Sequence, residues 1–336
     1  MLRILNTLSL DEAALRSLAA LPSVSLQQFP AEQGKWEVPE ELLRGPEIML
    51  CKGPPPNLKS MTELKVLQLG TVGYEHLRHL GLADAPLRVC NARGIYDTAI
   101  AEWNLAMMIN LVRDLRSMIR FQEQSHWERA PRFQLEIRGR VMGLWGYGGI
   151  GRETARLAKA FGLTVHVQTR KGVGPRPLAY AQPGTGDPDG VLPDRVFVAG
   201  QEREFLAGLD FLVLALPHTQ QSNGMVGEAE LKALPRSAFV LNPARGKIIQ
   251  EQALLKALTE GWIAGAALDT HFAFPLPAEH PLWKFPNVIL TPHISGADKS
   301  QHFPARIAEL FAQNVRRYQA GEPLLNELTA AEWREA

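Results

Sequence analysis

The sequence has little of several features that would place a chain in a specialised class. It has two cysteines, Cys51 and Cys90, in 336 residues, which provide neither a disulfide framework nor the spacing of a cysteine metal site. Its 36 Lys and Arg residues nearly balance its 35 Asp and Glu residues, for a formal net charge of +1. Electrostatics of the whole chain therefore favour neither nucleic acid nor an anionic membrane as a partner.

Long apolar runs and repeated segments are also missing. The N-terminal stretch "MLRILNTLSLDEAALRS" reaches charged residues without a long apolar run, so we expect neither a signal peptide nor a membrane span. The sequence has no repeat at solenoid spacing and no low-complexity tract. We expect a cytoplasmic protein whose ligand is a small molecule.

Short apolar runs define the organisation of the chain. Its length and its hydrophobic content of 46% suggest two domains. In the first hundred residues, "EIMLC" and "LKVLQL" alternate with Pro-rich or Gly-rich stretches. After Gln134 the alternation restarts with "VMGLW", "LTVHV", "FLVLAL", "AFVLN", "AGAALD" and "NVILT". Runs that are apolar on both faces are typical of buried parallel sheets, so the sequence predicts an α/β fold with a second, larger sheet.

Two helices and one irregular segment can also be predicted. Apolar residues at helical spacing predict one long helix from about Thr98 into the low 120s, and they are Leu105, Met108, Ile109, Val112, Leu115 and Ile119. A C-terminal helix is outlined by Ile307, Leu310, Phe311, Asn314, Val315 and Tyr318. The segment 171–195 is dense in Gly, Pro and Asp and has no period, which predicts a surface excursion.

A glycine-rich turn is the strongest single motif. In "VMGLWGYGGIGRETARLAKAFG", Gly146, Gly148 and Gly151 form G-x-G-x-x-G between an apolar strand and a helix. In a dinucleotide site the first glycine allows a tight turn, the second lets the backbone approach a pyrophosphate, and the third permits close packing of helix on strand. The N-terminus of the helix offers unpaired N–H groups to the anion. We therefore predict a dinucleotide site at this turn.

The acidic residue expected about 20 positions further on in such a site is missing. The chain reads "VQTRK" there, with Thr169 in place of the acid, followed by Arg170 and Lys171. Two cations without a carboxylate suit a 2′-phosphate, so the sequence favours NADP over NAD. If the two cations only begin a solvated loop, NAD remains the alternative.

Three further segments carry a resemblance to a known family. Together with the glycine-rich segment, "LDFLVLALPHTQQSNGMVG", "SAFVLNPARGKIIQEQALLKALTEGWIAGAALD" and "HPLWKFPNVILTPHISGAD" resemble the D-isomer-specific 2-hydroxyacid dehydrogenases, which include hydroxypyruvate and glyoxylate reductases and phosphoglycerate dehydrogenase. The resemblance implies two Rossmann-like domains. They are a doubly wound parallel-sheet cofactor domain of residues 99–299 and a smaller flavodoxin-like substrate domain of residues 1–98 plus 300–336. It also implies a homodimer and a small anionic 2-keto or 2-hydroxy acid as substrate.

The resemblance also assigns roles to residues that follow predicted strands. Arg245 in "NPARG" would hold the substrate carboxylate in a fork and polarise the carbonyl. His293 in "TPHISG" would exchange a proton with the carbonyl oxygen. Val72 and Gly73, in a segment similar to the family's G-V-G-x-D loop, would donate backbone hydrogen bonds to the substrate carboxylate.

The cofactor would contact a larger set of residues. By resemblance, Asp269 faces the nicotinamide carboxamide, and Leu216 and Pro217 lie along the cofactor. The complete predicted set is Gly146, Gly148, Gly149, Ile150, Gly151, Thr169, Arg170, Lys171, Leu216, Pro217, Ala244, Arg245, Asp269, His293 and Gly296. No metal is expected.

One position departs from the family pattern. In the family, the stretch after the Asp runs D-V-F-E-x-E-P, and its second Glu hydrogen-bonds the catalytic His. This chain reads "DTHFAFP", with Phe274 at that position. Without the carboxylate, the pKa of His293 should lie nearer its ordinary value of about 6.5, which leaves less of the acid form at neutral pH. His271 or Glu279 could orient the imidazole instead.

Several functions follow from these observations. The leading one is an NAD(P)-dependent oxidoreductase, with NADP preferred, that interconverts a 2-keto acid and a D-2-hydroxy acid. The alternative, motivated by Phe274, is a dinucleotide-binding sensor or scaffold with little or no turnover. Oxidation of formate or phosphite is disfavoured, because formate dehydrogenases, which resemble this family, carry an amide residue where this chain has Phe274.

Overall fold

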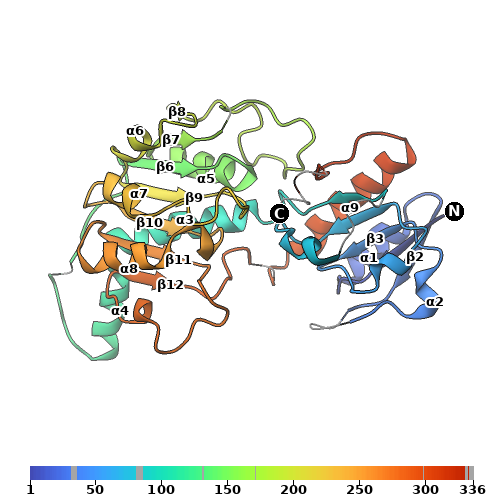
Figure 1. Ribbon diagram of the computed structural model, residues 1–336, viewed down its shortest axis with the longest axis horizontal. Helices are drawn as coiled ribbons and strands as arrows, with labels where there is room; N and C mark the ends of the chain where they lie inside the picture. The colour runs from blue at the N-terminus through green and yellow to red at the C-terminus, as the bar shows by residue number, and fades with distance from the viewer. Residues whose placement is uncertain are drawn as a thin grey trace. The chain divides into compact units, whose positions relative to one another are not determined.

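Two parallel β-sheets organise the chain in the computed structural model, which describes residues 1–31, 36–80, 86–130, 132–170, 172–297, 299–329 and 332 (Figure 1). The strands of the first sheet are β1 (Leu2–Asn6), β2 (Val24–Gln28), β3 (Ile48–Cys51), β4 (Val66–Leu69) and β5 (Arg88–Cys90). The strands of the second are β6 (Val141–Trp145), β7 (Thr164–Gln168), β8 (Arg195–Phe197), β9 (Phe211–Leu214), β10 (Phe239–Asn242), β11 (Gly265–Leu268) and β12 (Val288–Leu290).

The first sheet belongs to a unit made of the described residues of 1–96, 177–182 and 298–336. Its strand order is β2-β1-β3-β4-β5, the order of flavodoxin-like folds. Neighbouring residues of a strand point to opposite faces, so Ile4 packs into one core cluster with Phe311 while Leu5 packs into another with Met49. The helices of this unit are α1 (Glu12–Ala19), α2 (Glu40–Leu43) and α9 (Phe303–Gln319). Because a hydrophobic core covers both faces of this sheet, the sheet is doubly wound.

The second sheet belongs to a unit made of the described residues of 97–176 and 183–297. Its strand order is β12-β11-β10-β9-β6-β7-β8. The chain adds strands toward one side of the sheet from β6 to β8 and toward the other side from β9 to β12. The topological switch point, where open α/β sheets bind ligands, therefore lies between β6 and β9. Helices α3 (Asp97–Val112) and α5 (Gly149–Ala160) pack on one face. Helices α6 (Glu202–Leu206), α7 (Glu228–Ala233) and α8 (Glu251–Thr259) pack on the other.

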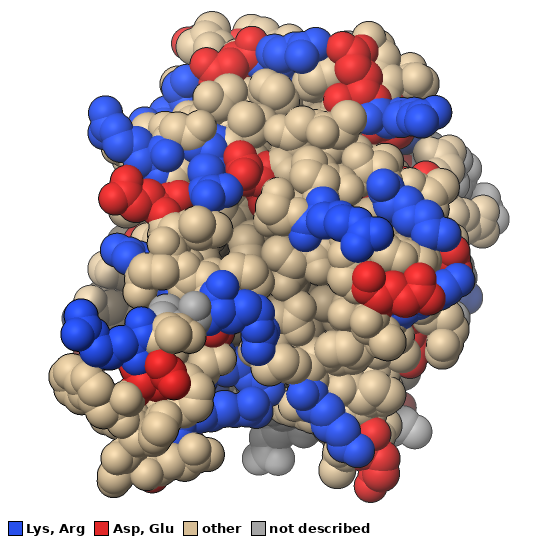
Figure 2. Space-filling model, turned by 90° about the vertical axis from the view of Figure 1, so that its left-hand side faces the viewer, with Lys and Arg blue, Asp and Glu red and all other residues tan. Residues whose placement is uncertain are grey.

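These sheets confirm the predicted fold class of two Rossmann-like domains. All eight apolar runs quoted above contain strands, and the C-terminal stripe lies on α9. The short strand β8 was not predicted, because "RVF" has only three residues and two of them are exposed. Among the described residues, no helix is both long and apolar enough to cross a membrane. Side chains of both charge signs are interspersed on the face drawn in Figure 2.

The prediction of one long helix after Thr98 was wrong. Helix α3 ends at Val112, and α4 (Leu115–Glu123) begins after Asp114, which has a φ of 49°. The Asp114 carboxylate accepts hydrogen bonds from Ser117 Oγ at 2.8 Å and from the N–H of Arg132 at 2.9 Å. Asp tolerates the left-handed conformation, and the break keeps the apolar spacing, so periodicity could not reveal it.

The connection between β7 and β8 was predicted to be a surface excursion, and this was wrong for several of its residues. Tyr180 is buried in the core of the first unit, where its hydroxyl donates to Glu309 Oε2 at 2.8 Å. Asp187 is buried too, and accepts a hydrogen bond of 2.6 Å from the Tyr147 hydroxyl. The N–H of Gly186 donates to the fully buried Glu153 of α5 at 2.6 Å. Isolated buried contacts of this kind leave no periodic pattern in the sequence.

Candidate functional site

The predicted site residues of the second unit follow the carboxyl ends of neighbouring strands. They are Gly146 after β6, Thr169 after β7, Leu216 after β9, Arg245 after β10, Asp269 after β11 and His293 after β12. The strands are parallel and in register, with Asn242 opposite Leu268 and Leu268 opposite Leu290. The six segments therefore lie along one edge of the sheet, on both sides of the switch point.

The glycine-rich loop has the geometry that a dinucleotide requires. Gly146 has a φ of 102°, and a Cβ there would lie 2.4 Å from the carbonyl oxygen of Ala215. A Cβ on Gly151 would lie 2.6 Å from the carbonyl oxygen of Gly146. At Gly148, the N-cap of α5, the nearest atom to a Cβ would be Arg176 Nη1 at 3.7 Å. The first and third glycines are thus required by packing, whereas the second leaves room for a pyrophosphate to approach.

An acidic residue that was not predicted from the sequence lies beside this loop. Asp97 begins α3 and is 8% exposed. A Cβ on Gly149 would lie 1.8 Å from Asp97 Oδ2, so the carboxylate occupies the space that any side chain at 149 would need. A carboxylate next to the first turn of α5 interacts favourably with the helix dipole. It would also repel a phosphate group bound nearby.

The end of β7 forms a closed turn without an acid. Thr169 Oγ1 accepts a hydrogen bond from the N–H of Gly172 at 2.9 Å and donates to its carbonyl at 3.0 Å. Arg170 is exposed, and its Nη1 donates to Gln221 Oε1 at 3.3 Å. Lys171, the second predicted cation, lies outside the described residues. The described part of this turn thus offers one arginine to a cofactor.

The loop of Arg245 is held by the buried Asn242 at the end of β10. The Asn242 amide donates to the carbonyl of Arg245 at 2.9 Å and accepts from the N–H of Ala244 at 3.1 Å. The side chain of Arg245 is partly buried, and its Nη1 donates to the carbonyl of Ala244 at 2.8 Å. A Cβ on Gly246 would lie 2.2 Å from the carbonyl oxygen of His271. The loops after β10 and β11 are therefore in direct contact.

Asp269 holds the turn that carries His293. It is fully buried, and its carboxylate accepts hydrogen bonds from Thr291 Oγ1 at 2.5 Å and from the N–H groups of Ile294 and Ser295 at 2.9 Å. The N–H of His293 donates to the carbonyl of Asp269 at 2.8 Å. His293 has a φ of 57° and an exposed side chain. The residue predicted to face the nicotinamide thus also fixes the backbone around the imidazole, and Gly296 lies in the turn that follows.

At position 274, where the family has Glu, this chain places an aromatic ring against the imidazole of His293. The rings of Phe274 and His293 have centroids 5.6 Å apart at an interplanar angle of 45°, and Phe274 is 61% exposed. Buried His271 places Nε2 2.8 Å from the carbonyl oxygen of Thr291. Glu279 is exposed and has no ion pair in the described part of the chain. Of the two proposed substitutes for the family Glu, His271 therefore acts on the backbone two residues before His293.

The remaining predicted substrate residues lie in the first unit. Val72 and Gly73 follow β4, the fourth strand of its sheet. Asn91 Nδ2 donates to the carbonyl of Val72 at 2.8 Å, and Thr71 Oγ1 donates to the carbonyl of Gly73 at 2.8 Å. Both carbonyls are thus used within the unit. Among the described residues, neither N–H donates to another group, as a carboxylate-binding pair requires.

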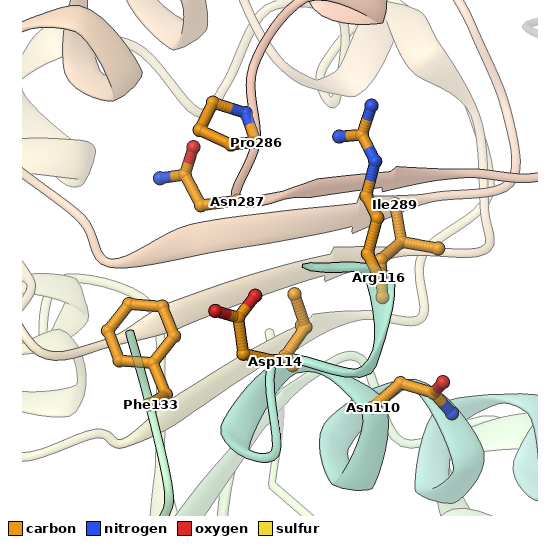
Figure 3. Close-up of a pocket in the computed structure, with 8 residues that line it drawn as sticks. Asn110, Asp114, Arg116, Phe133, Pro286, Asn287 and Ile289 are labelled. Carbon is orange, nitrogen blue, oxygen red and sulfur yellow. The ribbon is translucent and has the colours of Figure 1, made fainter. Parts of the chain in front are cut away.

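A small hollow in the second unit, drawn in Figure 3, is separate from these residues. Its lining is Asn110, Leu111, Asp114, Arg116, Phe133, Pro286, Asn287 and Ile289. Arg116 Nη2 donates to the carbonyl of Trp283 at 3.1 Å, and Nη1 donates to the carbonyls of Phe285 and Val288. Burial lowers the pKa of Arg116. Because no predicted site residue lines this hollow, we assign it no role in the reaction.

Comparisons with known proteins identify the family of this chain. The family model described as "D-isomer specific 2-hydroxyacid dehydrogenase, NAD binding domain" matches residues 105–295. The chain is 30% identical over 294 residues to a glyoxylate reductase of Thermofilum pendens, with 84% of this chain and 82% of that protein covered. It is 33% identical over 271 residues to a glyoxylate reductase of Thermococcus gammatolerans, with 77% and 74% covered.

Solved structures show the same architecture. A D-isomer specific 2-hydroxyacid dehydrogenase from Xanthobacter autotrophicus, solved with NADPH, is 26% identical, with a TM-score of 0.76 and 97% and 98% of the two chains covered. A family protein from Aeromonas salmonicida is 28% identical, with a TM-score of 0.76 and 98% and 99% covered. The chain therefore belongs to the D-isomer specific 2-hydroxyacid dehydrogenase family. It is an NAD(P)-dependent D-2-hydroxyacid dehydrogenase.

Proposed function

We propose that this enzyme interconverts a small 2-keto acid and a D-2-hydroxy acid, with Arg245 and His293 as its catalytic residues. The observation that carries the proposal is that both residues lie at the sheet edge that also presents the glycine-rich loop. Their loops are connected through the contact of Gly246 with His271 and through the hydrogen bonds of Asp269. A guanidinium and an imidazole are thus presented beside a dinucleotide site.

Each residue has a distinct task in this proposal. The nicotinamide supplies the hydride chemistry. Arg245 would pair with the substrate carboxylate and stabilise the negative charge that develops on the carbonyl oxygen. His293 would give a proton to that oxygen during reduction and take it back during oxidation. The N–H groups of Val72 and Gly73 would bind the carboxylate.

Phe274 packs against the imidazole of His293. The aromatic contact at 5.6 Å offers no hydrogen bond to the imidazole, but it restricts the ring on one side. Asp269 and His271 hold the backbone before and after His293. This rigid turn supports turnover. A dinucleotide-binding sensor with little or no turnover is the alternative, and the proximity of Phe274 is the observation that favours it.

For the cofactor, we propose a preference for NADPH. Thr169 stands where a ribose-binding acid would be, and the exposed Arg170 follows it. The relative from Xanthobacter autotrophicus was solved with NADPH. The Michaelis constants for NADPH and NADH test the preference in the wild type and in Thr169→Asp. We expect the wild type to favour NADPH and the variant to shift toward NADH, because a carboxylate there repels a 2′-phosphate. A wild type that favours NADH contradicts the proposal.

We further propose that the enzyme is a homodimer. Exposed apolar side chains gather on and near α4, with Ile119 54% exposed and Trp283 45% exposed. Both residues line one hollow together with Leu290. A second copy would cover this apolar surface. Light scattering after size exclusion should give twice the chain mass of 37.2 kDa, and Ile119→Asp should shift the protein toward monomer.

The cytoplasmic location, which rests on the two unpaired cysteines, remains a prediction.

The central experiment is a substrate panel with both cofactors. Purified enzyme should oxidise NADPH in the presence of glyoxylate, hydroxypyruvate or a larger 2-keto acid, measured by absorbance of the reduced nicotinamide. Arg245→Gln should lose most of this activity. Arg195→Gln is the matched control, because Arg195 is exposed on β8 and pairs with Glu204. Tight NADPH binding without turnover on the whole panel would overturn the proposal and favour the sensor.

A further inference from the structure

The glycine-rich loop itself offers no cation to a pyrophosphate. Two successive glycines, Gly148 and Gly149, stand where the ligand would approach. Arg152, the first cation after them, is 6% exposed and turned to structural use. Its Nη2 donates to the carbonyl of Gly174 at 2.5 Å, and its guanidinium lies 5.0 Å from the centroid of the Tyr147 ring. Arg152 therefore serves the packing of α5 rather than a ligand.

A different arginine lies at the point of approach. Nη1 of Arg176, in the connection between β7 and β8, is 3.7 Å from the Cβ position of Gly148. That glycine is the one whose bare backbone lets a pyrophosphate come close. The side chain of Arg176 is partly buried. A guanidinium in this position faces the same space as the unpaired N–H groups at the start of α5.

The backbone that leads to Arg176 is held in place within the second unit. Upstream, Thr169 and Gly172 close a turn through two hydrogen bonds, and the carbonyl of Gly174 accepts from Arg152. Pro175 and Pro177 flank the arginine, and prolines on both sides restrict the backbone to extended conformations. A backbone restricted in this way loses little further entropy when the side chain binds a ligand.

A carboxylate also lies at this loop. The Asp97 carboxylate lies against Gly149, where it would oppose a bound phosphate. We infer that Arg176 is a pyrophosphate-binding residue, supplied to the dinucleotide site by the connection between β7 and β8. The inference rests on the proposed function for the identity of the ligand, a nicotinamide dinucleotide. Because NADPH and NADH share the pyrophosphate, Arg176 contributes to the binding of both, whereas Arg170 is placed to distinguish them.

Fluorescence titration with NADPH and with NADH tests this inference. Arg176→Ala should weaken the Kd for both cofactors about 10-fold to 100-fold, as expected for the loss of a charge-assisted hydrogen bond. Arg176→Lys should restore part of the affinity, because it keeps the charge and loses the fork. Arg195→Ala, which removes a paired arginine at the far end of the same connection, should bind within about 2-fold of the wild type.

The outcomes separate this inference from the proposed function. Unchanged Kd values for both cofactors in Arg176→Ala would overturn the inference, and so would a loss confined to NADPH, which would assign Arg176 to the 2′-phosphate. If Arg176→Ala unfolds at a lower temperature without cofactor, the Kd values of Arg176→Gln and Arg176→Lys decide the question. A wild type that binds both cofactors and reduces no keto acid would overturn the proposed function, while the Kd values would still judge the role of Arg176.

Discussion

Replacement of Asp269 by Asn tests whether this residue positions the catalytic turn. The carboxylate accepts three hydrogen bonds, from Thr291, Ile294 and Ser295. An amide cannot replace it, because its NH₂ group would face one of the N–H donors. Ser295 is buried, with 4% of its surface exposed, so its N–H has little access to water. Thr291 and Ile294 are more exposed and can bind water instead.

The magnitude follows from this difference in exposure. One buried donor without an acceptor costs about 1–3 kcal/mol, and two weakened exposed bonds add less, so we expect Asp269→Asn to lower the free energy of unfolding by about 2–3 kcal/mol. A shift of about 1 Å in a catalytic group costs on the order of 100-fold in rate. Since Asp269 fixes the turn of His293, we expect a fall of that order in kcat.

Urea denaturation and NADPH-coupled turnover measure the two effects. Asp210→Asn is the matched control, because Asp210 accepts from the N–H of Val141 at 2.9 Å and from Arg140 at 2.6 Å, at the amino end of β9. This control lies at the opposite end of the strands from the site, so it should lose stability and keep its kcat. If Asp269→Asn unfolds and turns over like the wild type, the carboxylate does not hold the turn and the reasoning is refuted.

Three other perturbations have expected results. Phe274→Glu places a carboxylate beside His293, which favours the charged imidazole, so the pH profile of ketone reduction should move up by about 0.5–1 unit; an unmoved profile would mean that position 274 does not reach the imidazole. Gly146→Ala forces a Cβ into the main chain after β9 at a φ of 102°, and should cost about 1–3 kcal/mol of stability together with NADPH affinity; wild-type values in thermal melts and titrations would argue against a strained turn. Burial raises the pKa of the Cys51 and Cys90 thiols, so neither should react with iodoacetamide in native protein at neutral pH, as mass spectrometry can check, and rapid labelling would contradict their burial.

Much of the fold could be predicted from the sequence, and so could the placement of the site residues along one edge of the second sheet. Both depend on properties that single residues carry. Apolar runs such as "FVLN" of β10 are buried on both faces, so composition alone marks them as strands of a parallel sheet. The placement of Arg245 and His293 along one edge then follows from the parallel direction of the strands. The glycine motif is local for the same reason, since it joins one strand to one helix.

The features that could not be predicted depend on contacts between distant parts of the chain. Asp97 meets Gly149 from the start of another helix, and Arg176 meets Gly148 from an irregular connection. Neither residue has a motif of its own, so only the folded backbone shows what it touches. The helix break at Asp114 was missed for a different reason, because a left-handed residue can interrupt a helix without disturbing the spacing of its apolar side chains.

The anchored connection between β7 and β8 also limits how this enzyme can be shortened. Deletions in ordinary surface loops are tolerated because they remove few contacts. Here, loss of Gly174 and Gly186 would take hydrogen-bond partners from Arg152 and from the fully buried Glu153 on α5. A truncated chain would carry poorly satisfied charges on the helix that begins the cofactor site. The segment has the composition of a dispensable insertion, but its residues supply hydrogen-bond partners to that helix.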